Sequence, residues 1–140
     1  MQIKIRNSVV LKNEFADAVN RLLQSRPMPA KACLELNTAL DELSTQAKIL
    51  RKARRDITLR HCCKDKDGEA VSNEFHMVVF PDAESEKVCR KELGELFEEY
   101  ATVEMTDPVT IYTDENVTPQ DLRFLGGLVQ VKEREVKQGA

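Results

Sequence analysis

The chain has 140 residues and a formal net charge of −3 at pH 7, with 41% apolar, 32% charged and 5% aromatic residues. A chain of this length is typical of one domain with one core, so we expect residues 1–140 to form a single domain. The composition excludes an intrinsically disordered chain, and the small net charge gives no reason to expect a nucleic acid or a membrane as partner.

The first elements expected along the chain are a strand and two helices. Residues 1–6 alternate apolar and polar side chains, which predicts a short strand with one buried face. Apolar residues then recur at spacings of three and four, which predicts an amphipathic helix over residues 8–25. Pro27 and Pro29 follow it. Proline ends a helix because it has no amide hydrogen, but it is favoured in a first turn, so a second helix is predicted over residues 29–61.

The second helix carries the clearest periodic pattern in the chain. Its core positions alternate steps of three and four, the 3.5-residue period of a coiled-coil seam. The short connection predicts that the first two helices are antiparallel neighbours, with a further partner at the far end of the longer one. The seam is compatible both with packing inside one chain and with pairing to a second copy in a homo-oligomer. The predicted seam, in which Arg54 is the one charged member, consists of Cys33, Leu36, Leu40, Leu43, Ala47, Leu50, Arg54 and Ile57.

The remaining elements are shorter. Residues 64–69 contain Asp-Gly and predict a turn, and residues 74–80 are compatible with a strand. Helices are predicted over 83–100 and 118–126, with Thr118 as N-cap, and short strands over 102–106 and 109–113. The charged tail 132–140 is expected to fray. The predicted fold class is α+β, mainly α: an antiparallel helical hairpin with a long second helix, a third helix and a small accessory β-sheet.

Charge is distributed unevenly along the chain. Residues 48–66 contain eight basic and two acidic side chains, whereas residues 82–115 contain eleven acidic and three basic ones. The basic end of the second helix can lie along the acidic third helix, dock on a protein partner, or track nucleic-acid phosphates. No glycine-rich phosphate loop or aromatic interleaving accompanies it, so nucleic acid is the alternative and not the first choice. The candidate partner-binding residues are Arg51, Lys52, Arg54, Arg55 and Arg60.

No catalytic, cofactor-binding or metal-binding residues are assigned. Cys62 and Cys63, next to His61, lack the two-to-four-residue spacing of zinc ligands, so buried thiols are the preferred interpretation. Nothing in the pattern supplies the oriented base that a cysteine nucleophile needs. Residues 65–76 fail as a calcium loop, because the glycine at its sixth position and the closing glutamate are missing. We expect a protein that is not an enzyme and holds no cofactor.

Targeting signals are not evident in the sequence. No apolar run approaches the roughly 18 residues that span a bilayer, and the amino terminus lacks an apolar signal region. We therefore expect no membrane partner and no signal-peptide secretion. In a reducing cytoplasm the four cysteines would be thiols.

The order of these features resembles a family of small tailed-bacteriophage proteins without an assigned activity. The resemblance follows the opening IKIRNS at 3–8, the long charged second helix with its Asp-Gly turn, KELGEL at 91–96, VEM at 103–105 and TPQDL at 118–122. The adjacent cysteines at 62 and 63 depart from that pattern. The resemblance implies a viral protein in the virion or the host cytoplasm. We expect it to act by protein–protein contact, either as a tail or head component or as an inhibitor of a host factor.

Overall fold

The computed structural model describes residues 1–24 and 27–134. Their α+β fold is mainly α, as predicted. The elements in chain order are β1 (Gln2–Arg6), α1 (Asn7–Val10), α2 (Asn13–Gln24), α3 (Ala30–His61), α4 (Ala83–Glu98), β2 (Tyr100–Glu104), β3 (Val109–Tyr112), α5 (Pro119–Leu125), the 3₁₀ helix η1 (Gly126–Leu128) and β4 (Val129–Lys132).

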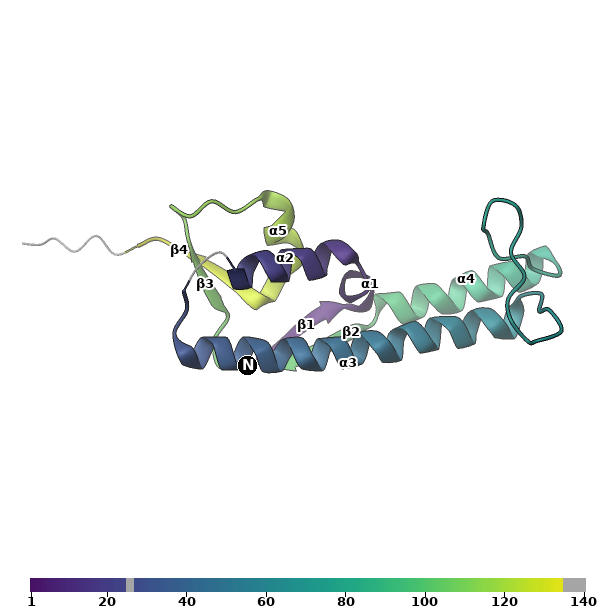
Figure 1. The fold of residues 1–140 in the computed structure, drawn as a ribbon, viewed down its shortest axis with the longest axis horizontal. Helices are drawn as coiled ribbons and strands as arrows, with labels where there is room; N and C mark the ends of the chain where they lie inside the picture. The colour runs from purple at the N-terminus through teal and green to yellow at the C-terminus, as the bar shows by residue number, and fades with distance from the viewer. Residues whose placement is uncertain (25–26, 135–140) are drawn as a thin grey trace, which may run out of the picture.

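The molecule is elongated and has two parts, which share the helix α3 (Figure 1). In the body, α2, α5 and both small sheets gather over the N-terminal half of α3. The arm consists of α3 from Arg51 onward, the connecting residues 62–82, and α4, which returns beside α3 in the opposite direction. The arm therefore projects away from the body.

In the described ranges 1–24 and 27–134, the body contains two separate two-stranded sheets. β1 and β2 are antiparallel, and the pairs Ile3–Val103 and Ile5–Ala101 turn toward the core. β3 and β4 are parallel. Only the first of the two strands predicted after the acidic helix therefore joins the opening strand. The second pairs with β4, which the sequence analysis did not predict.

One hydrophobic cluster fills the body. It joins the inner face of the β1–β2 sheet to the apolar faces of α2, α3 and α5. In the arm, Ile57, Cys62 and Cys89 are buried but lie outside this cluster, and Cys89 is the one buried side chain of α4. The main buried side chains of the body are Ile3, Ile5, Phe15, Val19, Leu22, Leu36, Leu43, Val103, Ile111, Leu125 and Leu128.

The helix predicted over residues 8–25 is broken in two. The chain leaves helical geometry at residues 11–12, between α1 and α2. On a continuous helix Val10 and Phe15 would lie about 140° apart, yet both belong to the same core cluster. Asn7 fixes α1 in its separate direction, because its backbone N–H donates to Glu99 and its buried side chain donates to the Leu96 carbonyl, each at 2.8 Å.

Other boundaries shift by one or two residues. α3 begins after Pro29, and α4 ends at Glu98 because Tyr100 already pairs with Arg6 in the β1–β2 sheet. α5 covers Pro119–Leu125, with Thr118 as N-cap as predicted. The predicted helix end at 25 and tail residues 135–140 lie outside the described residues. The start of the tail that was predicted to fray is ordered. Lys132 belongs to β4, and the Arg134 side chain donates a hydrogen bond to Asp114 at 2.8 Å.

Five of the eight positions of the predicted seam of α3 are buried, two are partly buried and one is exposed. Leu36, Leu43, Ala47, Leu50 and Ile57 are buried, whereas Arg54 is exposed. Ala53, one position earlier, takes the more buried side of the helix instead. The hairpin predicted between the first two long helices is not the main helix packing of the structure. Instead, α3 packs most extensively on α4, and α2 packs on α5.

Candidate functional site

The five candidate partner-binding residues lie on the arm half of α3, and all five are exposed. The structure divides them into two groups. Arg55 and Arg60 form ion pairs with other parts of the arm. Within residues 1–24 and 27–134, the side chains of Arg51, Lys52 and Arg54 form no ion pair and no hydrogen bond.

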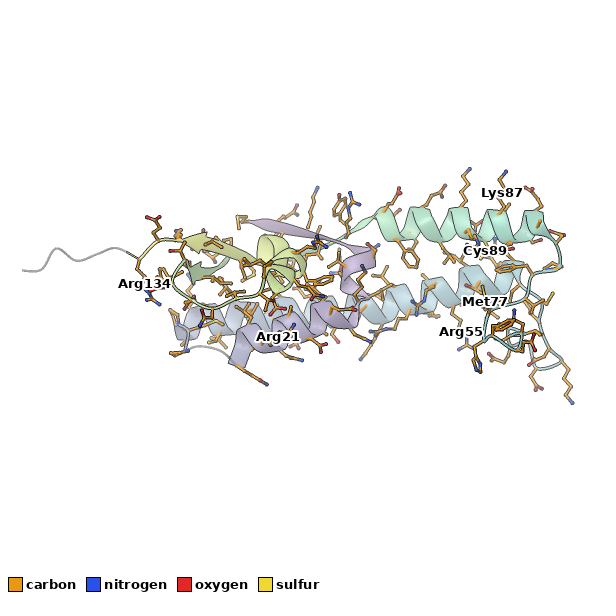
Figure 2. The ribbon with its side chains drawn as sticks, turned by 90° about the horizontal axis from the view of Figure 1, so that it is seen from above. Arg21, Arg55, Met77, Lys87, Cys89 and Arg134 are labelled. Atoms are coloured by element: carbon orange, nitrogen blue, oxygen red, sulfur yellow. The ribbon has the colours of Figure 1, made fainter. Side chains whose placement is uncertain are left out.

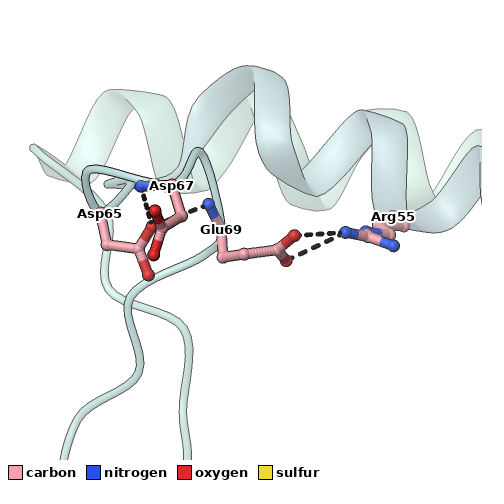
Figure 3. Close-up of polar contacts among 4 residues, drawn as sticks. All are labelled: Arg55, Asp65, Asp67 and Glu69. Carbon is pink, nitrogen blue, oxygen red and sulfur yellow. Dashed lines mark hydrogen bonds and ion pairs between the residues drawn. The ribbon is translucent and has the colours of Figure 1, made fainter.

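Arg55 ties the connecting segment to α3. One of its terminal nitrogens lies 2.8 and 2.9 Å from the two carboxylate oxygens of Glu69 (Figure 3). Both side chains are more than half exposed, so the pair contributes at most about 1 kcal/mol to stability. Its effect is positional, because it holds the loop that carries Glu69 beside the cationic helix.

The basic end of α3 and the acidic α4 do pair, but at one carboxylate. A carboxylate oxygen of Glu92 lies 3.4 Å from a terminal nitrogen of Arg60 and 3.0 Å from Nε2 of His61. In the described part of the chain, Glu95, Glu98 and Glu99 form no ion pair with α3. The internal complementarity expected from the charge distribution thus uses Arg60 and leaves three cations uncompensated.

Residues 62–82 form the tip of the arm as two loops with the same backbone. In the first tip loop (residues 65–69), Oδ1 of Asp65 accepts the N–H groups of Asp67 and Glu69 at 2.9 and 3.0 Å. In the second tip loop (residues 73–77), Oδ1 of Asn73 accepts those of Phe75 and Met77 at 2.9 and 3.0 Å. The two loops are therefore equivalent, with an offset of eight residues.

The backbone confirms this equivalence. The fourth residue of each loop has a positive φ, 78° at Gly68 and 61° at His76. The flanking bridges Lys64–Ala70 and Ser72–Val78 keep the same offset. At the base of the loops, Cys63, Val71 and Val79 form a closed ring, in which each N–H donates to the carbonyl of another member at 2.9–3.0 Å.

The residues predicted to be a turn or a strand take different forms. The Asp-Gly turn at 64–69 is confirmed. The strand considered for 74–80 is replaced by the second tip loop and one isolated bridge, because the Asn73 side chain captures the N–H groups that a strand would offer to a neighbour. Phe75 and Met77 are 73% and 56% exposed as a result. The sequence analysis did not predict that either side chain is exposed. The available signal was Asn73, a second short acceptor side chain eight positions after Asp65.

The cysteines and histidines do not converge on one site. Cys62 and Cys89 are buried in the arm, whereas Cys33 lies at the opposite end of α3 and His76 in the second tip loop. Burial raises the pKa of the Cys89 thiol, which keeps it neutral at physiological pH. Among the residues that the structure describes, no three His, Cys, Asp or Glu side chains are placed to hold a metal ion.

Among the residues that the structure describes, two hollows of the body are large enough to consider as sites. One, of about 700 Å³, lies between the start of α3 and the β3–β4 sheet and is lined by Lys31, Tyr112 and Arg134 among others. The other, of about 330 Å³, lies between α2 and α5. Beside it, Arg21 forms two hydrogen bonds to Asp121, at 2.8 and 2.6 Å, and they lower the pKa of that buried carboxyl. Neither hollow contains a residue proposed from the sequence as a partner-binding residue.

In the described part of the chain no helix is both long and apolar enough to cross a membrane. Comparisons of the chain with protein-family models, with curated proteins and with solved structures found no match.

Proposed function

We propose that this chain is a bacteriophage protein that acts by binding another protein, without catalysis, through the arm. The observation that carries the proposal is the group of three uncompensated cations, Arg51, Lys52 and Arg54, on a helix that projects beyond the body. Charges of one sign on an extended surface favour an oppositely charged partner and speed its association. The bacteriophage assignment rests on the sequence resemblance alone.

Two versions of this function fit the same surface. In one, the protein is a tail or head component of the virion, and the arm contacts a neighbouring virion protein. In the other, it works in the host cytoplasm and the arm covers an acidic surface of a host factor. Both need a complementary surface and no chemistry from the protein itself.

The test uses a charge-reversal variant and a matched control. Tagged protein is expressed during infection, and a partner that co-purifies is identified and then purified for titration by calorimetry. We expect Arg51→Glu/Arg54→Glu to weaken binding by about tenfold or more at 150 mM salt. The control, Lys4→Glu/Arg123→Glu, makes the same charge change at two exposed cations of the body and should alter the affinity less than threefold.

Circular dichroism verifies that both variants are folded. Equal affinity of wild type and the arm variant would contradict the proposal, as would an equal loss in the control. Sedimentation of the protein alone shows whether the captured partner is a second copy of the chain.

Nucleic acid binding is the alternative that the same cations support. A gel-shift titration at about 20 mM salt separates the two, because low salt strengthens electrostatic contacts with phosphates. The protein-binding proposal expects no shift at micromolar protein.

A further inference from the structure

The two tip loops show which of their residues the fold requires. Asp65 and Asn73 occupy the same position and make the same two hydrogen bonds, so this position must carry a short side chain with an acceptor oxygen. The third and fifth positions differ completely: Asp67 and Glu69 in the first loop correspond to Phe75 and Met77 in the second. Since the first loop forms the same backbone with carboxylates, neither Phe75 nor Met77 is needed to form the turn.

Core packing does not explain these two side chains either. Both are more than half exposed, and the loop that carries them lies at the end of the arm that is farthest from the body. Exposed apolar side chains gain free energy when they leave water for an apolar pocket. Aromatic and methionine side chains are also enriched in the centres of protein–protein interfaces.

The second tip loop is held in one shape before any partner arrives. Asn73 binds the N–H groups of Phe75 and Met77, and the Asn73 N–H donates to the Met77 carbonyl at 2.8 Å. A loop that is already ordered loses less conformational entropy on binding.

The charges around the loop indicate the kind of partner. Figure 2 places Met77 and Arg55 at the same end of the arm, and the uncompensated cations Arg51, Lys52 and Arg54 lie on α3 beside Arg55. The tip (residues 62–82) carries five carboxylates, at residues 65, 67, 69, 74 and 82, against two lysines, at residues 64 and 66. An anionic membrane or a nucleic acid would be repelled by those carboxylates at the point where Phe75 and Met77 would have to insert.

We propose that Phe75 and Met77 are the apolar anchor of the arm. They insert into an apolar pocket of a protein partner, and carboxylates beside that pocket face Arg51, Lys52 and Arg54. This inference rests on the proposed function and names the residues at the centre of its interface.

The equivalent loop supplies the substitutions for the test. The variant Phe75→Asp/Met77→Glu gives the second tip loop the residues that the first already carries in the same turn, so folding should be preserved. We expect its affinity for the purified partner to fall at least 30-fold, as for central interface residues. The control, Lys66→Ala/Asp67→Ala in the first tip loop, should change the affinity less than threefold.

A photo-crosslinker identifies the surface that the anchor meets. Benzoylphenylalanine placed at position 75 should crosslink the partner, and the same group at position 67 should not. The crosslinked peptide should come from an apolar pocket with at least two Asp or Glu residues at its rim. A crosslink to a pocket with a basic rim, or to lipid or nucleic acid, would overturn the proposal.

The outcomes separate this inference from the proposed function. If no protein co-purifies with the wild type, both fall together. If a partner binds the wild type and binds Phe75→Asp/Met77→Glu within threefold of that affinity, only the anchor is disproved and binding through the arm stands.

Discussion

The body and the arm use the same helix in different ways. In the body, α3 packs against α1 and the β1–β2 sheet, and its side chains Leu36 and Leu43 belong to the main cluster, which also includes α2 and α5. In the arm, α3 has one helical neighbour, and the few buried side chains lie outside that cluster. The comparison indicates that stability is concentrated in the body, while the arm carries the uncompensated cations of α3 and the exposed apolar side chains Phe75 and Met77.

The largest expected effect comes from opening a cavity in the body. Leu36 is completely buried, so Leu36→Ala removes apolar contacts that the surrounding elements cannot fully replace. We expect the free energy of unfolding to fall by about 3 kcal/mol, measured as a lower urea midpoint at an unchanged slope. A loss below 1 kcal/mol would show that the body is not the stable part.

The next effect tests the Arg21–Asp121 pair. Asp121→Asn weakens two charge-assisted hydrogen bonds between α2 and α5, and we expect a loss of about 1–2 kcal/mol at pH 7.

The Arg21–Asp121 pair makes the free energy of unfolding depend on pH. Arg21 lowers the pKa of Asp121 in the folded protein, so the carboxylate stabilises the fold above its unfolded pKa of about 4. That contribution is lost as the pH falls from about 4 through the lowered pKa. Urea titrations between pH 7 and pH 2 should show a smaller acid loss in Asp121→Asn, and parallel curves would contradict this cause.

A matched pair of isoleucines compares the two parts directly. Ile111→Val in the body and Ile57→Val in the arm each remove one buried methyl group. We expect the first to cost about 1 kcal/mol of global stability. The second should cost less globally and instead speed amide hydrogen exchange in the C-terminal turns of α3, because the arm can open locally. Equal effects on global stability would mean that body and arm unfold as one unit.

The smallest expected effects lie in the tip loops. Gly68 adopts a positive φ that disfavours side chains, although a Cβ there would meet nothing within 4 Å, so Gly68→Ala should cost about 1 kcal/mol through conformation alone. His76 occupies the same position, and His76→Gly should stabilise the protein by about 0.5 kcal/mol. Thermal melts check both signs, and opposite signs would show that the loops are not equivalent.

Much of the fold could be predicted from the sequence where the signal is local. The long α3, the start of α4, the N-cap of α5 and the opening strand follow from periodicity and from residues near their own positions. The break between α1 and α2 could not be predicted, because the apolar spacing is helical on both sides. It results from Asn7 binding the end of α4, which lies about 90 residues away in the sequence.

The candidate site was predictable only in part, for a related reason. Spacings of three and four allow either Ala53 or Arg54 on the buried side of α3, and only the position of α4 decides between them. The five cations were found from composition, but their division into paired and uncompensated residues depends on where Glu69 and Glu92 lie. The alternation around Phe75 is that of a strand, and the Asn73 side chain overrides it.

The ring of Cys63, Val71 and Val79 has a consequence for how this tip could diversify. Because it brings both ends of the connecting segment together, each eight-residue unit is inserted between points that already touch. A loop could be exchanged, lengthened or duplicated while α3 and α4 keep their spacing. The residues of one loop can therefore change without moving the helices that carry it.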